Sequence, residues 1–215
     1  MDIGQWLVIG LCIFLFAWFL GGWWYSRRRG HAVLTWLRDG LEAIGKPGET
    51  RWLSPLHASA QVIVNEAHSP FRKLGAVFVL EPRENLIVWA FRHLLGRRDE
   101  LYLRADLRTP PVQEVEAGRK RSLDTAGGIK AVKDNPYASL PGTDVFSLSR
   151  QGKTDDQAIE QLTIFLNRYE NAILRLSLQR TSPHLILRAR LTPLMAEPLA
   201  EFLAALQAAL TQHLL

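Results

Sequence analysis

The segment from Ser147 to Thr154 comes closest to the residues that bind a phosphate group. It reads Ser-Leu-Ser-Arg-Gln-Gly-Lys-Thr and connects an apolar run to a helical pattern. A phosphate-binding P-loop also needs a glycine five residues before Gly152, so that backbone amides can wrap around the phosphates. Serine occupies that position, and no other glycine lies in the segment. The segment therefore predicts a turn and a helix start, and no nucleotide site.

Histidines and acids show no spacing that indicates catalysis or metal binding. No histidine pairs with another histidine, a cysteine or a carboxylate at the spacing of metal ligands. The acidic pairs Asp99-Glu100 and Asp155-Asp156 stand at the starts of expected elements, where carboxylates favour helix and turn ends. We therefore predict no catalytic, cofactor-binding or metal-binding residue and favour a non-enzymatic role. The six histidines are His31, His57, His68, His93, His184 and His213.

The first 30 residues have the pattern of a transmembrane anchor. No charged residue occurs from Ile3 to Ser26. About twenty helical residues cover the roughly 30 Å hydrocarbon core of a bilayer, and a helix satisfies its own backbone groups there. Trp6 at one end and Trp23-Trp24-Tyr25 at the other fit the aromatic belts at the two membrane interfaces. We predict a single-pass membrane protein with its anchor in residues 1–30.

Charge around this segment argues against a cleaved signal peptide and predicts an orientation. Signal peptides carry positive charge before the apolar run, whereas here Arg27, Arg28 and Arg29 follow it. The bulky Trp23-Trp24-Tyr25 makes a poor cleavage site. The positive-inside rule keeps the arginines in the cytoplasm. We expect the N-terminus outside and the C-terminal domain on the cytoplasmic side of a plasma or inner membrane.

Residues 31–50 predict a juxtamembrane amphipathic helix, either a linker or the first helix of the domain. Residues 51–215 form the predicted cytoplasmic domain, with strands at 61–65 and 76–80, a helix at 83–95 and an alternating strand at 101–108. Regular periodicity fails between residues 109 and 143, where prolines and glycines recur. Such a stretch in a compact domain is usually functional or disordered, so we expect a long irregular loop.

The C-terminal part returns to regular patterns and suggests a fold. A short strand at 145–148 precedes a helix capped by Asp155 or Asp156, a hairpin of strands at 174–178 and 185–191, and a last helix with its apolar stripe from Leu199 to Leu210. These elements predict an α+β domain with a two-layer α/β sandwich. From Ala76 onward their order matches a ferredoxin-like βαββαβ unit with an extra strand and a C-terminal helix.

Composition favours a membrane surface over nucleic acid as the partner. The net charge is +5 with a pI near 9.7, and three of the positive charges belong to the anchor flank. Cys12, the only cysteine, lies inside the apolar run, so the domain has neither a disulfide nor a thiolate metal site. Nucleic acid would also call for aromatic residues on the sheet, and only one is visible, at Tyr102.

One helix and several arginines form the candidate interaction surface. The stretch from Leu86 to Leu95 is apolar over most of its circumference, which is typical of a core helix or of a helix resting on an anionic leaflet. We predict a module that binds anionic lipid headgroups or a protein partner. The alternatives are a membrane-bound enzyme with a dispersed site and a nucleic-acid binder. The candidate surface residues are Arg97, Arg98, Arg104, Arg108, Arg119 and Arg121.

Overall fold

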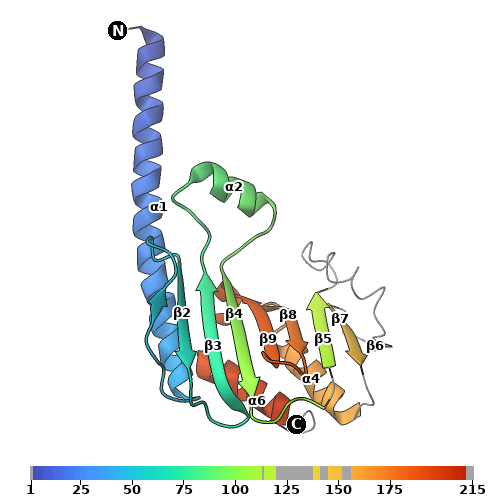
Figure 1. The fold of residues 1–215 in the computed structure, drawn as a ribbon. Coiled ribbons are helices and arrows are strands. Elements are labelled where there is room, and N and C mark those ends of the chain that lie inside the picture. Colours follow the sequence, from blue (N-terminus) through green and yellow to red (C-terminus); the bar gives the residue numbers. More distant parts are fainter. Residues whose placement is uncertain (1, 113, 120–137, 141–144, 152–155, 212–215) are drawn as a thin grey trace.

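The computed structural model describes residues 2–112, 114–119, 138–140, 145–151 and 156–211. One long helix, α1 (Ile3–Glu42), projects beyond a twisted antiparallel sheet, and its C-terminal half lies against the sheet together with α4 (Asp156–Arg168) and α6 (Leu199–Thr211) (Figure 1). No helix of the described residues covers the opposite face of the sheet. The chain is therefore α+β, with a helical layer on one face of a sheet.

Nine strands of the described chain form this single sheet, in the order β1-β2-β3-β4-β9-β8-β5-β7-β6. Neighbouring strands all pair antiparallel. The strands are β1 (Arg51–Trp52), β2 (Ser59–Val64), β3 (Phe71–Val79), β4 (Glu100–Leu107), β5 (Glu114–Arg119), β6 (Ala138–Leu140), β7 (Phe146–Gln151), β8 (Ile173–Leu178) and β9 (Leu185–Arg190). Two shorter helices, α2 (Leu86–Leu94) and α5 (Leu191–Leu194), complete the described elements.

Helix α1 changes character along its length. From Ile3 to about Phe19 its large apolar side chains are exposed, whereas its last four turns are buried against the domain at a spacing of three and four residues. Gly40 lets it approach α6, since a Cβ there would lie 2.4 Å from the Cβ of Leu199. Residues 31–44 thus contribute to the core and are not a linker. Their buried apolar side chains are Val33, Leu37, Leu41 and Ile44.

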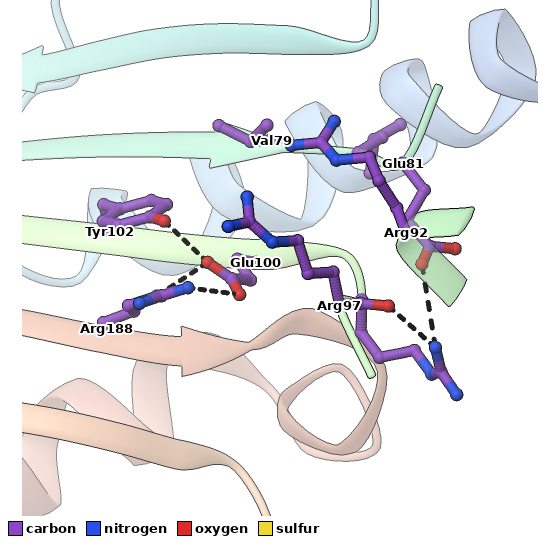
Figure 2. A pocket seen from close by; sticks show the side chains of 9 residues that line it. Val79, Glu81, Arg92, Arg97, Glu100, Tyr102 and Arg188 are labelled. Atoms are coloured by element: carbon purple, nitrogen blue, oxygen red, sulfur yellow. Dashed lines mark hydrogen bonds and ion pairs between the residues drawn. The ribbon is translucent and has the colours of Figure 1, made fainter. Parts of the chain in front are cut away.

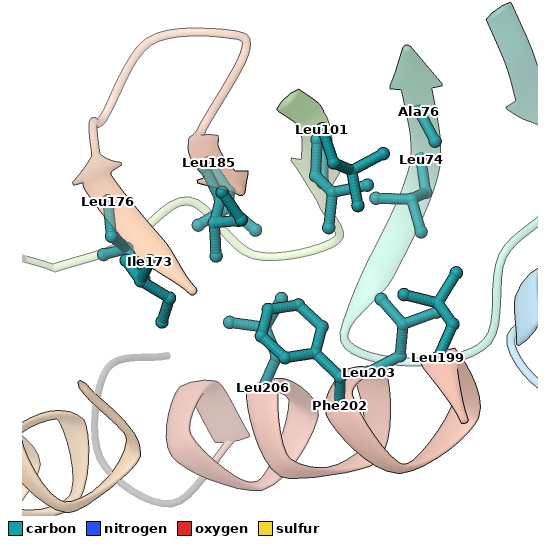
Figure 3. Packing of buried hydrophobic residues seen from close by; sticks show 14 of the residues in the cluster. Leu74, Ala76, Leu101, Ile173, Leu176, Leu185, Leu199, Phe202, Leu203 and Leu206 are labelled. Atoms are coloured by element: carbon teal, nitrogen blue, oxygen red, sulfur yellow. The ribbon is translucent and has the colours of Figure 1, made fainter. Parts of the chain in front are cut away.

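Alternating strand residues supply the other half of the core. In β4 and β9 every second side chain points to the helical layer, as the alternation in the sequence predicts. Phe202, Leu203 and Leu206 of α6 pack against this face, and Figure 3 shows them below the sheet residues. The buried strand residues include Leu101, Leu103, Ala105, Leu185, Leu187 and Ala189.

The structure departs from two sequence-based expectations, the ferredoxin-like order and the irregular loop at 109–143. Of that loop, residues 113, 120–137 and 141–143 lie outside the described ranges. Strands β3 and β4 are antiparallel neighbours, so α2 is an excursion between two hairpin strands and cannot be the crossover of a ferredoxin-like βαβ unit. Residues 109–143, expected to be irregular, contain β6 and also β5, which pairs with both β7 and β8 inside the sheet. The other predicted strands and helices are present within a few residues of the expected bounds.

Candidate membrane-contact surface

Helix α2 presents its apolar side chains to the outside. Asn85 caps it by accepting a hydrogen bond from the Val88 amide at 3.1 Å, and the helix ends before Gly96, whose positive φ of 74° suits glycine. None of the nine residues of α2 is buried by the described residues. Ile87, Phe91 and Leu94 share one face and are 78%, 64% and 85% exposed. The core-helix interpretation is therefore wrong.

The same helix is docked sideways against α1. Trp18 Nε1 donates a 2.9 Å hydrogen bond to the carbonyl oxygen of Arg83, and the rings of Trp18 and Trp89 are 5.5 Å apart. At Gly22 a Cβ would lie 2.5 Å from that carbonyl oxygen, so only glycine allows this approach. Trp18 and Gly22 belong to the uncharged stretch of α1. Helix α2 thus lies beside the apolar half of α1 and away from the sheet (Figure 1).

Length and composition give α1 the properties of a membrane-crossing helix. Its most apolar stretch is not buried anywhere in the described structure. An N-terminal signal sequence has the same properties. Where this stretch ends, Arg27 and Arg28 place their guanidinium groups over the rings of Trp23 and Trp24, at 5.6 and 5.5 Å. Arg83, which precedes α2, places its guanidinium group 4.7 Å from the centre of the Tyr25 ring.

Buried carboxylates fix both connections of α2 to the sheet. Asp99 accepts hydrogen bonds from the Glu81 amide at 2.9 Å and from Arg83 Nη2 at 3.2 Å. Glu81 lies 3.6 Å from Arg83 and 3.8 Å from both His93 and Arg98. Since Glu81 precedes α2 and Asp99 follows it, these ion pairs join the two ends of the excursion. Asp99, predicted to stand at an element end, is here part of a structural network, whereas Asp156 begins α4 and Asp155 lies outside the described residues.

Glu100 forms a second and tighter pair on β4. It accepts two hydrogen bonds from Arg188 of β9, at 2.7 and 2.8 Å, and a third from the Tyr102 hydroxyl at 2.6 Å. A bidentate carboxylate–guanidinium pair of this kind is strong and geometrically specific. All three donors come from β4 and β9, so the pair holds the two strands together.

A small cavity lies between this pair and the C-terminal end of α2. Its volume is about 60 Å³. Arg92 and Arg97 extend over the ends of β3 and β4, on the side where Tyr102, Glu100 and Arg188 lie (Figure 2). Arg98 is directed away, because its Nη1 donates to the carbonyl oxygens of His93 and Arg97 at 3.0 and 2.7 Å. The lining residues are Val79, Leu80, Glu81, Arg92, Arg97, Arg98, Glu100, Tyr102 and Arg188.

The structure does not bring the predicted arginines into one cluster. Arg97 and Arg98 lie at the α2 end of the sheet, whereas Arg104 is halfway along β4 on the open face. Arg108 directly follows the far end of β4, about 27 Å along the strand from Glu100 at the usual rise of about 3.4 Å per residue. It donates to the carbonyl oxygens of Phe71 and Ala67. Arg119 ends β5, and Arg121 lies outside the described residues.

Further cations outside the candidate set lie at the α2 end of the sheet. Arg190 has a lowered pKa, mainly because of burial and then because Arg119 and Arg98 are near, while Glu100 opposes the shift. Arg98 and Arg119 are therefore each near enough to Arg190 to repel it. Arg92 could have been found from its position in the apolar helix. Alternation marks Arg188 as a residue on the polar face of its strand, but its partner Glu100 is distant in sequence, and Arg83 carried no signal.

The open face of the sheet has a hollow of about 310 Å³ above Gly75, lined by Gln61, Val77, Tyr102 and Arg104. Tyr102 is the one aromatic side chain in this lining, and its hydroxyl is bound to Glu100. Within the described ranges no three histidine, cysteine, aspartate or glutamate residues are grouped to hold a metal ion. His184 accepts a hydrogen bond from the Leu107 amide and has a structural role.

In comparisons with known proteins, no family model matches the chain and no curated protein matches it. Geometry and chemistry therefore carry the functional argument.

Proposed function

We propose that this protein is a single-pass membrane protein whose cytoplasmic domain is a non-enzymatic module held against an anionic leaflet by α2. One observation carries the proposal: an exposed apolar helix is docked beside Trp18, inside the uncharged stretch of α1. If α1 crosses the bilayer, its docking partner is at membrane depth as well. Helix α2 then lies along the cytoplasmic interface, as amphipathic helices do.

Continuity of α1 supports an anchor over a signal sequence. The helix runs without interruption from the apolar stretch into the core at Val33 and Leu37. Removal of the apolar stretch would also remove Trp18 and Gly22, which hold the segment at Arg83. A cleavable sequence has no need of such contacts with the mature domain. Arg27, Arg28 and Arg29 favour the cytoplasmic side for everything after them.

Energies of the expected size support stable contact with the leaflet. Burying an apolar side chain of this size stabilises by roughly 1.5–3 kcal/mol, so three exposed side chains on α2 contribute roughly 4.5–9 kcal/mol on full insertion. Each arginine near an anionic surface adds about 1 kcal/mol, less at high salt. The candidates at this end of the domain are Arg92, Arg97, Arg98, Arg119 and Arg190.

Flotation with lipid vesicles tests this proposal on a fragment that begins at Arg27. This fragment lacks the docking residues Trp18 and Gly22, so α2 must fold on the leaflet itself. We expect the fragment to float with vesicles containing phosphatidylglycerol at low salt and to bind less at high salt. The double variant Phe91→Ser/Leu94→Ser should lose most of the binding. Val112→Ser/Ile164→Ser removes two exposed apolar side chains elsewhere, so it is the control and should bind as before. Equal loss in both variants would contradict a specific role for α2.

A reporter fused after Leu215 tests the orientation. We expect activity from a reporter that works only in the cytoplasm. Replacing Arg27, Arg28 and Arg29 with neutral residues and adding lysines before Trp6 should weaken or invert the orientation. A C-terminus outside the cytoplasm in the unaltered chain would refute the proposed orientation.

A further inference from the structure

We propose that the cavity below α2 binds the phosphate group of an anionic glycerophospholipid from the adjacent leaflet, with Arg92 and Arg97 as its ligands. This inference rests on the proposed function, because it takes its ligand from the membrane that α2 contacts. It adds a defined lipid site to a general attraction between charges.

Charge balance in the cavity leaves two guanidinium groups for a ligand. Glu100 is satisfied by Arg188 and Tyr102, and Glu81 lies among Arg83, His93 and Arg98. Arg92 and Arg97 form no side-chain hydrogen bond or ion pair with the described residues, although both line the cavity. Two cations that share one small space repel each other, so an anion between them lowers the energy of the site.

Size and geometry select a phosphate group. A water molecule needs about 10–15 Å³ of such volume, so about 60 Å³ holds roughly four to six non-hydrogen atoms, which is the size of a phosphate group. Guanidinium groups match phosphate oxygens with two parallel hydrogen bonds each. Figure 2 shows Arg92 and Arg97 extending in the same direction over the strand ends, as two ligands of one anion would.

Position selects a lipid as the source of the phosphate. Arg83 contacts Glu81 of the cavity and also stacks on Tyr25 of α1, so the cavity is level with the end of the apolar stretch. Lipid headgroups occupy this level when α1 spans the bilayer. Exposed Phe91 and Leu95 flank Arg92 on α2 and offer apolar surface to the acyl chains. A free phosphate ion would gain nothing from them.

Native mass spectrometry of the full chain in detergent micelles tests the site. The probes are phosphatidylglycerol, phosphatidylcholine and inorganic phosphate. We expect one retained phosphatidylglycerol on the unaltered chain, weaker retention of phosphatidylcholine because choline adds a positive charge, and no competition by millimolar inorganic phosphate. Arg92→Gln/Arg97→Gln should lower the occupancy at least tenfold. Arg72→Gln/Arg104→Gln removes the same charge from exposed positions away from the cavity and should leave occupancy unchanged.

Unchanged lipid occupancy in Arg92→Gln/Arg97→Gln would overturn the site, and so would equal loss in both double variants. Displacement of the lipid by inorganic phosphate would overturn the choice of a lipid ligand. A separate measurement tests the proposed function: the depth in the bilayer of a fluorophore attached to the variant Leu94→Cys on α2. A label in the bilayer together with unchanged occupancy refutes the site alone, whereas a label in water refutes the membrane contact on which the site depends.

Discussion

Replacing Gly22 with alanine tests whether α1 holds α2 in place. The new Cβ would lie 2.5 Å from the Arg83 carbonyl oxygen and 2.7 Å from the Glu84 amide nitrogen. Both contacts are with backbone, so no flexible side chain can give way. Ordinary contacts begin at 3.4 Å, and the difference from 2.5 Å requires the segment to move by about 0.9 Å. That movement strains the 2.9 Å hydrogen bond from Trp18 and the packing of Trp18 on Trp89.

Overpacking costs roughly 1–3 kcal/mol, and a lost hydrogen bond roughly 0.5–1.5 kcal/mol. We therefore expect about 2 kcal/mol weaker docking, which raises the undocked population roughly 30-fold. A nine-residue helix is not stable alone, so undocking should expose the chain at Arg92 to trypsin. The assay is the rate of tryptic cleavage after Arg92 in the full chain in detergent micelles, since this rate follows the open population.

Gly21→Ala is the matched control, because a Cβ at Gly21 meets nothing within 4 Å. The Gly21 variant should be cleaved at the rate of the unaltered chain, and the Gly22 variant roughly 30-fold faster by the same free-energy estimate. Equal rates for the two variants would refute the argument that close contact with α1 holds α2.

Three further predictions concern the domain. A fragment beginning at Arg27 should show a cooperative thermal transition by circular dichroism, and one beginning at Pro47 should not. The shorter fragment loses four buried side chains of α1, each worth roughly 1.5–3 kcal/mol, against a total stability of about 5–15 kcal/mol. Leu176→Asp should lower the free energy of unfolding by several kcal/mol, because it buries an unpaired carboxylate. Urea denaturation measures this as a lower midpoint, and an unchanged midpoint would contradict the assigned core. His57 has a pKa lowered from its ordinary value by burial and then by His31 and Arg27. The unfolded state therefore binds more protons below about pH 6.5, so thermal stability should fall from pH 7 to pH 5. His57→Asn, which suits the positive φ of 56°, should flatten this dependence, and the exposed control His68→Asn should not.

Local patterns predicted the elements whose partners are close in sequence. The alternation at Leu101–Leu107 and in the hairpin ending at Leu191 identified core strands, and the stripe beginning at Leu199 identified a core helix. The pairing of β3 with β4 could not be predicted, because α2 separates the two strands in sequence and no local pattern joins them. Strand β5 was missed, although Val115 and Ala117 alternate with Glu114 and Glu116, because the nearby prolines and glycines dominated the interpretation.

The candidate membrane-contact surface was only partly predictable, because it depends on contacts between residues that are distant in sequence. The apolar helix and the arginines after it were visible in sequence, but its docking joins Trp18 to Trp89, which no local pattern connects. Alternation placed Arg104 and Arg108 on one face of β4. The hydrogen bonds of Arg108 to the carbonyl oxygens of Phe71 and Ala67 depend on the fold. The buried partners of Glu81 and Glu100 required the fold, since one of them, Arg188, comes from β9.

The depth of α2 in a bilayer tests the central claim most directly. Cys12→Ser leaves the chain without cysteine, so a fluorophore can be attached at Leu94→Cys on α2 or at the control Ile164→Cys on α4, both exposed positions. The labelled full chain is reconstituted into bilayers of lipids brominated on their acyl chains. We predict strong quenching of the label at position 94 and none at position 164. Equal absence of quenching at both positions would contradict membrane contact by α2.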